Sequence, residues 1–304
     1  MTKWTSERIG DLKGKRIILT GGASGIGYSA TEVLAARGAD LIMAVRNTVK
    51  GEKAASKIRV HHPAASVTVM HLDLGDLSSV RQFASEFTGL FDRLDLLINN
   101  AGVMVPPYAK TKDGFELQFG TNHLGHFALT AHLLPLLMAT PLSRIVTISS
   151  IAARRAKIRF DNLDGSRGYN PMTFYRQSKL SNLLFAMELQ NRLERAGSST
   201  ISVACHPGIS VTNLLSRGSG KETGAVMKWI MGIVAQPANK GALPTLYAAT
   251  HPDLRGGEYI GPDGPGNTKG YPVLNNDPAT LYKPALAAKL WEVSEALTGV
   301  RYSI

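Results

Sequence analysis

The sequence predicts one α/β domain built around a doubly wound, mostly parallel sheet. Short apolar runs alternate with helical stretches along most of the 304-residue chain. These runs are almost continuously apolar, as in strands that are buried on both faces. A glycine-rich segment also separates the first predicted strand from the first predicted helix, where folds of this class bind phosphates. Together the three observations favour a Rossmann-type sheet with helices on both faces.

Strands and helices alternate regularly from residue 16 to residue 205. The predicted strands are Arg16–Thr20, Leu41–Val45, Val67–Leu72, Leu94–Ile98, Arg144–Ile148 and Ile201–Cys205. The predicted helices are Ile26–Arg37, Lys50–Val60, Leu77–Phe87, Phe115–Met138 and Phe174–Ala196. Because crossovers between parallel strands are right-handed, this order winds the helices onto both faces of the sheet.

The alternation changes after His206. The segment from about residue 209 to 236 is predicted to form a substrate lid. The segment from about residue 261 to 304 is predicted to form a C-terminal cap. Between them we expect a helix at Ala238–Ala249 and a short strand at Glu258–Ile260, and a last helix at Ala285–Ala296 follows a loop at Gly261–Pro284. No linker separates these parts, so residues 1–304 are predicted to form one domain. The apolar face of the lid fits a substrate pocket and equally a packing or oligomer contact; it consists of Val226, Trp229, Ile230, Ile233 and Val234.

Composition limits the class of protein. The formal net charge is +11, but Lys and Arg are spread along the chain, and the densest group is Arg154, Arg155, Lys157 and Arg159. We therefore expect a solvated basic surface and no nucleic-acid partner. The sequence has one cysteine, Cys205, and shows neither a signal peptide nor a membrane-spanning run. These features predict a soluble cytoplasmic protein without stable membrane insertion. We expect no metal ion.

The segment Thr20-Gly-Gly-Ala-Ser-Gly-Ile-Gly27 is the predicted dinucleotide site. A glycine-rich turn before a helix lets backbone amides and the helix N-terminus approach a pyrophosphate closely. The alternative is a plain tight turn between a strand and a helix. The predicted cofactor contacts in this segment are Gly21, Ser24, Gly25, Ile26 and Gly27.

The end of the second strand predicts which nicotinamide cofactor binds. An acidic residue there would bind the ribose 2′-hydroxyl of NAD, but this sequence has Val45-Arg46-Asn47. The guanidinium of Arg46 suits a 2′-phosphate, and Asn47 beside it is a further predicted contact. NADP(H) is therefore expected in preference to NAD(H). The alternative is that Arg46 is only a solvated residue.

Six motifs in one order resemble the short-chain dehydrogenase/reductase family, from about Leu12 to Ala296. They are Thr20-Gly-x-x-x-Gly-x-Gly27, Asn99-Asn-Ala-Gly102, Asn122, Ser149-Ser150, Tyr175-x-x-x-Lys179 and Pro207-Gly208. Each motif alone is weakly specific. Their common order and spacing are typical of this family of nicotinamide-dependent oxidoreductases.

The Tyr-x-x-x-Lys spacing occurs twice, at Tyr108–Lys112 and at Tyr175–Lys179. Two side chains four residues apart share a face only in a helix. The first copy follows two prolines and is predicted to be loop, whereas Tyr175 opens a long helical pattern. We therefore predict Tyr175 as the general acid or base, with the charge of Lys179 lowering its phenol pKa.

The resemblance implies further roles. Ser150 would polarise the substrate carbonyl, Lys179 would also hold the nicotinamide ribose, and Asn122 would support a water-linked proton relay. The remaining predicted cofactor contacts are Asp73, Leu74, Asn100, Ala101, Gly102, Pro207, Gly208 and Thr212. Ser210 replaces the apolar residue usual in the Pro-Gly-x-x-x-Thr element. His206 is interpreted as a positioned loop residue, not as a base.

An insert at Arg154–Met172 and the run Asn122-His-Leu-Gly-His-Phe127 are similar to the retinol-dehydrogenase-like and protochlorophyllide-reductase-like branch. This implies a small-molecule carbonyl or alcohol substrate, and we expect reduction of a bulky apolar aldehyde or ketone. Two alternatives stay open: a cofactor-sensing regulator or scaffold on the same fold, and an NAD-dependent alcohol dehydrogenase. Members often dimerise through helices matching Phe115–Met138 and Phe174–Ala196, which leaves a homo-oligomer open.

Overall fold

The computed structural model describes residues 3–209 and 236–304. Within them one sheet has the order β3-β2-β1-β4-β5-β6-β7-β8. Its strands are β1 (Arg16–Thr20), β2 (Asp40–Val45), β3 (Ser66–His71), β4 (Leu96–Asn99), β5 (Arg144–Ile148), β6 (Ile201–Cys205), β7 (Tyr259–Pro262) and β8 (Pro272–Leu274). All neighbouring pairs are parallel except β7 with β8. The predicted doubly wound, mostly parallel fold in a single domain is confirmed.

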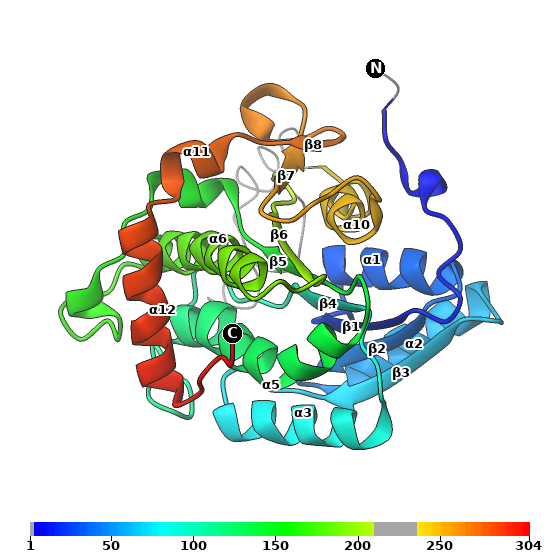
Figure 1. The fold of residues 1–304 in the computed structure, drawn as a ribbon, viewed down its shortest axis with the longest axis horizontal. Coiled ribbons are helices and arrows are strands. Elements are labelled where there is room, and N and C mark those ends of the chain that lie inside the picture. The colour runs from blue at the N-terminus through cyan, green and yellow to red at the C-terminus, as the bar shows by residue number, and fades with distance from the viewer. Residues whose placement is uncertain (1–2, 210–235) are drawn as a thin grey trace.

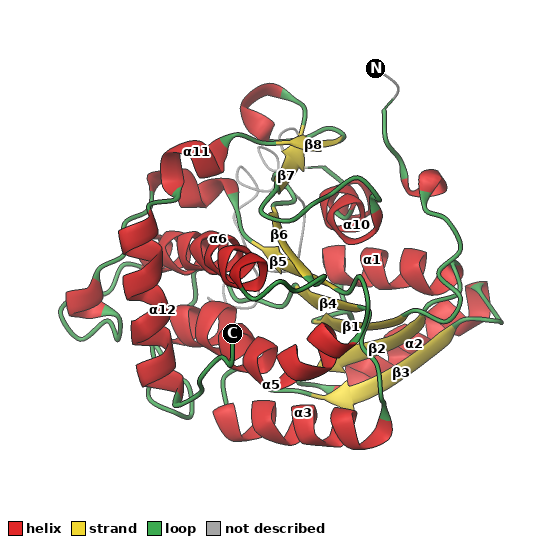
Figure 2. Ribbon diagram, viewed as in Figure 1, coloured by secondary structure: helices red, strands yellow, loops and turns green. Residues whose placement is uncertain are grey.

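Helices cover both faces of this sheet (Figures 1 and 2). They are α1 (Gly25–Ala36), α2 (Thr48–His61), α3 (Leu77–Leu90), α4 (Leu117–Phe119), α5 (Gly125–Ala139), α6 (Pro171–Arg195), α9 (Ala238–Gly241), α10 (Leu243–Thr250), α11 (Asp277–Leu281) and α12 (Pro284–Thr298). Apolar side chains of α1, α2 and α10 pack into one core, and those of α3 and α5 into a second core. α12 lies outside α6 (Figure 1).

The C-terminal residues cover part of α5 and α6. Tyr302 donates a hydrogen bond from its hydroxyl to the Phe127 carbonyl at 2.7 Å. The rings of Trp291 and Phe185 stack with centroids 5.8 Å apart. The chain itself therefore occupies part of the helix surface through which members of the family often dimerise, and the possible homo-oligomer stays open.

The register of the sheet gathers the predicted site residues at one edge. Thr20 lies opposite Ala44, Asn99 opposite Thr147, and Ile148 opposite Cys205. Because parallel strands end on the same side, the segments that follow β1, β2, β4, β5 and β6 meet there. The strand order reverses between β1 and β4, which is where doubly wound sheets bind ligands.

Two expected elements differ from the structure. The helix predicted at Phe115–Met138 begins with α4, passes through a π-helical turn at Gly120–Leu124 and continues as α5. The predicted loop at Gly261–Pro284 is wrong, because it contains β8 and α11. These elements are three and five residues long, too short for a periodic pattern to indicate them.

Other expectations agree or lie outside the described residues. The segment of the first Tyr-x-x-x-Lys copy is not helical, and Lys110 forms an isolated bridge with Glu116. The body of the predicted lid, with Ser210, Thr212 and its apolar face, lies outside the described residues.

Candidate active site

The glycine turn is attached to the loop after β4 through Thr20, the last residue of β1. The Thr20 hydroxyl accepts hydrogen bonds from the backbone N–H groups of Asn100 and Ala101, at 2.9 Å each. The Asn100 side-chain amide donates to the Thr20 carbonyl at 2.8 Å. Two segments about 80 residues apart in sequence are thereby held in one arrangement.

Two glycines in this turn have no room for a side chain. A Cβ on Gly27 would lie 2.5 Å from the Gly21 carbonyl oxygen and 2.7 Å from the Asn100 amide nitrogen. Gly21 has φ +74° and backs onto Ala101, whose Cα would lie 3.0 Å from a Cβ. The chain therefore packs tightly where the turn passes into the first turn of α1, and the exposed backbone fits the close approach of a pyrophosphate.

Asn122 lies in the π-helical turn and is completely buried. Its side-chain oxygen accepts from the Val103 N–H at 2.7 Å, and its side-chain nitrogen donates to the Val103 carbonyl at 2.9 Å. The same nitrogen donates to the Ser178 hydroxyl at 3.0 Å. Asn122 thus joins the loop after Gly102 to α6, the helix that carries Tyr175 and Lys179.

Ser150, Tyr175 and Lys179 meet beside the end of β5. The Ser150 side chain lies near enough to the Tyr175 phenol to lower its pKa, and the Ser150 hydroxyl accepts from the Ala152 N–H at 3.1 Å. Lys179 donates to the Ile148 carbonyl at 3.1 Å, and its Nζ lies 6.0 Å from the centre of the Tyr175 ring. Tyr175 and Lys179 are 8% and 4% exposed, so both face a largely desolvated space.

Burial dominates the pKa values of Tyr175 and Lys179. Burial raises the pKa of Tyr175, and the nearby Ser150 side chain only partly opposes this shift. In the structure, desolvation of the phenolate outweighs the predicted lowering of this pKa by Lys179, whose ammonium donates to the Ile148 carbonyl. Burial also lowers the pKa of Lys179 to about 8. At neutral pH Tyr175 is a protonated acid beside a charged lysine.

The remaining predicted cofactor residues surround the same edge. Arg46 is exposed directly after β2, whereas Asn47 caps α2 by accepting from the Lys50 N–H at 2.9 Å. The Asp73 carboxylate accepts from the Gly75 N–H at 2.9 Å. The other described residues of this set, which lie in or beside the segments that follow the strands, are Ser24, Gly25, Ile26, Leu74, Asn100, Ala101, Gly102, Pro207 and Gly208.

His206 agrees with its interpretation as a positioned residue. It is fully buried, and its Nδ1 accepts from the Gly208 N–H at 3.2 Å. Its Nε2 lies 3.3 Å from the Asn275 side-chain nitrogen. The ring therefore supports the Pro207-Gly208 turn through its hydrogen bond with the Gly208 N–H.

Three contributors were missed in the sequence. Thr20, Ser178 and Arg154 organise the site without belonging to the predicted set. Arg154 pairs with Asp277 at 2.7 Å and donates to Gly266 and Asn267, which ties the insert to the C-terminal segment. No local signal marks these residues, because their partners are distant in sequence.

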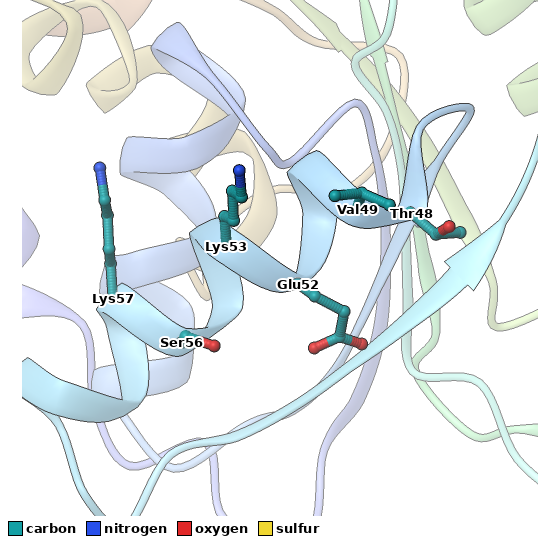
Figure 3. A pocket seen from close by; sticks show the side chains of 6 residues that line it. All are labelled: Thr48, Val49, Glu52, Lys53, Ser56 and Lys57. Atoms are coloured by element: carbon teal, nitrogen blue, oxygen red, sulfur yellow. The ribbon is translucent and has the colours of Figure 1, made fainter.

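A hollow on the surface of α2 is separate from this site. The residues labelled in Figure 3 all come from that one helix and are exposed; they are Thr48, Val49, Glu52, Lys53, Ser56 and Lys57. None of the predicted catalytic residues lines it. A surface with a single wall does not enclose a substrate.

Buried histidines predict acid sensitivity. Burial lowers the pKa of His123 to about 3, with a further contribution from His126. In the unfolded chain His123 binds a proton near pH 6.5, whereas the folded chain resists this protonation. The free energy of unfolding is therefore undiminished above that pH and declines as the pH falls towards 3. Between pH 6.5 and pH 5 we expect a loss of about 2 kcal/mol from His123.

Urea unfolding at pH 7.5 and pH 5.0 measures this loss. In His123→Gln the difference in the free energy of unfolding between pH 7.5 and pH 5.0 should be smaller than in wild type by about 2 kcal/mol. Carboxylates such as Asp95, whose pKa is lowered, titrate below this window. An unchanged pH dependence in the variant would show that His123 does not cause it.

Within residues 3–209 and 236–304, no helix combines the length and the apolar character needed to cross a membrane.

Comparisons with known proteins agree with the geometry. The family model described as short chain dehydrogenase matches residues 15–222. Retinol dehydrogenase 12 of Mus musculus is 39% identical over 294 residues, which cover 96% of this chain and 88% of the relative. Retinol dehydrogenase 11 of Homo sapiens is 37% identical over 299 residues, covering 95% and 87%.

Solved structures show the same fold. An uncharacterised protein from Mycobacterium paratuberculosis superimposes with a TM-score of 0.83 at 42% identity, covering all of both chains. The NADP active-site complex of Pseudomonas aeruginosa RhlG has a TM-score of 0.67 at 20% identity over 84% of this chain and 98% of that one, a likeness of fold alone. With the ordered motifs, the shared sheet and the matching family model, the chain belongs to the short-chain dehydrogenase family of oxidoreductases, in its retinol-dehydrogenase-like branch.

Proposed function

We propose that the protein is an NADP(H)-dependent reductase of bulky apolar aldehydes or ketones, with Tyr175 as the proton donor. The observation that carries this proposal is the buried group formed by Tyr175, the Ser150 side chain that lowers its pKa, and Lys179 one helical turn away, with Asn122 bonded to the same helix. The names of the retinol dehydrogenase relatives support a bulky apolar substrate. The single buried Cys205 is compatible with a cytoplasmic location, which stays a prediction.

The residues of the turn fit a dinucleotide. Gly21 and Gly27 have no side chain, so the backbone of the turn stays accessible to the pyrophosphate. Gly21, Ser24, Gly25, Ile26 and Gly27 would hold its pyrophosphate. Asn100, Ala101, Gly102, Pro207, Gly208 and Thr212 would line its nicotinamide half, and Asp73 and Leu74 its adenine. Bound NADPH supplies the hydride.

The protein residues handle the proton. Ser150 donates a hydrogen bond to the substrate oxygen and polarises the carbonyl. Tyr175, kept protonated by burial, gives its proton to the same oxygen as negative charge develops there. The ammonium of Lys179 then stabilises the phenolate that Tyr175 becomes, and Asn122 keeps α6 in position.

A panel of aldehydes and ketones tests the proposal. Purified protein is mixed with NADPH and each compound, and the loss of NADPH absorbance is followed. Faster turnover of long apolar compounds than of short polar ones is expected. NADPH binding without turnover of any compound would favour the alternative of a cofactor-sensing regulator.

Arg46 provides the test of cofactor preference. Arg46→Asp removes the guanidinium that would pair with a 2′-phosphate and adds a carboxylate that suits a free 2′-hydroxyl. We expect NADPH affinity to fall by roughly one to two orders of magnitude, since charge-assisted hydrogen bonds contribute about 1.5–3 kcal/mol. NADH affinity should rise, reversing the preference.

Equilibrium titration of cofactor fluorescence with both variants and both cofactors measures this change. Lys53→Asp is the matched control, because it makes the same charge change at an exposed position within α2, beyond the end of β2. Equal losses in the two variants would indicate a general charge effect. A wild-type preference for NADH would support the alternative of an NAD-dependent alcohol dehydrogenase.

A further inference from the structure

His126 connects the two halves of the site. It lies in the first turn of α5 and is 1% exposed. Its Nδ1 lies 2.9 Å from the backbone carbonyl oxygen of Asn122, and its Nε2 lies 2.9 Å from the hydroxyl oxygen of Thr20. One ring therefore touches both the π-helical turn and the end of β1, which are separated by about 100 residues in sequence.

The partners determine where the imidazole proton lies. A carbonyl oxygen has no proton to give, so Nδ1 must donate to Asn122. The Thr20 hydroxyl already accepts from the N–H groups of Asn100 and Ala101. Its two lone pairs are thereby used, and its single proton is free to point to Nε2, which accepts it.

The alternative acceptor for the Thr20 proton is weaker. The Ile98 carbonyl lies 3.4 Å from the hydroxyl, half an ångström farther than Nε2. A doubly protonated ring would place an N–H against a hydroxyl oxygen with no remaining lone pair. Burial, with a further contribution from the Lys179 charge, lowers the pKa of His126 to about 4, which agrees with a neutral ring.

We propose that His126 is a positioning residue that joins the glycine turn to Asn122 through a neutral ring with its proton on Nδ1. The inference rests on the proposed function, which gives the glycine turn its role in cofactor binding and Asn122 its role in the reaction. The Nδ1 bond holds the π-helical turn that presents Asn122 to Val103 and Ser178. The Nε2 bond orients the hydroxyl on which Asn100 and Ala101 are anchored.

The ring proton can be observed without substrate or cofactor. In protein labelled with ¹⁵N-histidine, the His126 ring signals are identified as those lost in His126→Asn. At pH 7 we expect a protonated Nδ1 and an unprotonated Nε2. A proton on Nε2, or a charged ring, would overturn the assignment, and neither result depends on whether any carbonyl is reduced.

Two substitutions separate the two bonds. His126→Asn retains an amide N–H near the position of Nδ1 and loses the acceptor for Thr20. His126→Gln places a carbonyl oxygen near the position of Nε2 and loses the donor to Asn122. We expect the first to raise the Kd for NADPH by roughly two- to tenfold, and the second to lower kcat by a similar factor.

His132→Gln, on the same helix, is the control, because its partly buried ring contacts neither Thr20 nor Asn122. It should leave both parameters unchanged. Equal changes of Kd and kcat in both His126 variants would show that the ring only fills space, and would refute the separate bonds. If the wild-type protein reduces no carbonyl, the proposed function fails, whereas the ring proton and the Kd for NADPH still decide the role of His126.

Discussion

Replacing Tyr175 with phenylalanine is expected to lower kcat/KM for carbonyl reduction by about 10²- to 10⁴-fold, the usual contribution of a positioned general acid. The substitution removes one oxygen atom and keeps the ring that packs against its neighbours. Burial keeps this phenol protonated beside Ser150, so the substitution removes the acid that the proposed mechanism uses. Steady-state NADPH consumption with the best substrate of the panel measures the effect.

The second Tyr-x-x-x-Lys copy provides a control for this experiment. Tyr108→Phe also removes one phenol oxygen, but Tyr108 is 46% exposed and its hydroxyl donates to the Asp164 carbonyl at 3.1 Å, away from Ser150 and Lys179. It should retain full activity. NADPH affinity should be retained in both variants, so that a loss in Tyr175→Phe reflects chemistry. Equal turnover in wild type and Tyr175→Phe would remove Tyr175 from the mechanism.

Gly27→Ala is expected to raise the Kd for NADPH by roughly ten- to a hundredfold, corresponding to the 1–3 kcal/mol of an overpacked site. The new Cβ would lie 2.5 Å from the Gly21 carbonyl oxygen and 2.7 Å from the Asn100 side chain. Relief requires movement of the turn or of the Asn100 amide that holds Thr20. Either movement displaces the backbone that faces the pyrophosphate.

Fluorescence titration with NADPH measures this Kd. The matched control is Gly89→Ala in α3, where a Cβ meets no atom within 4 Å. That substitution also replaces a helical glycine with a better helix former, so its affinity should not change. If Gly27→Ala binds NADPH as tightly as wild type, the turn does not hold the pyrophosphate.

Much of the fold could be predicted from the sequence, for a local reason. The continuous apolar runs at β1, β2, β5 and β6 match the strands within one residue at each end. β4 begins at Leu96, two residues later than predicted, although Asp95 already exchanges backbone hydrogen bonds with Arg16 and Arg144. Such small shifts at element ends are common, since strand ends depend on pairing partners.

The choice between the two Tyr-x-x-x-Lys copies could also be made from the local sequence around each copy. Pro106 and Pro107 disfavour a helix before Tyr108, whereas the apolar spacing after Tyr175 predicts one. The structure has Tyr175 and Lys179 on α6 and no helix at Tyr108. The catalytic roles of these residues stay predictions until turnover is measured.

The tertiary structure decided what depends on distant neighbours. The pKa of Tyr175 follows from its burial, which a spacing of four residues does not reveal. The π-helical turn at Asn122 and the short elements after Gly261 interrupt patterns that sequence periodicity would continue or overlook.

By itself the sequence determined the order of strands and helices, the glycine turn and the helix that carries Tyr175, because short-range sterics and hydrophobic periodicity act along the chain. Only the folded chain decided how these parts are joined. Thr20, Asn122 and His126 share two hydrogen bonds at 2.9 Å across the sheet edge. Such contacts arise from the packing of β1 against the helix after β4, and no local pattern records them.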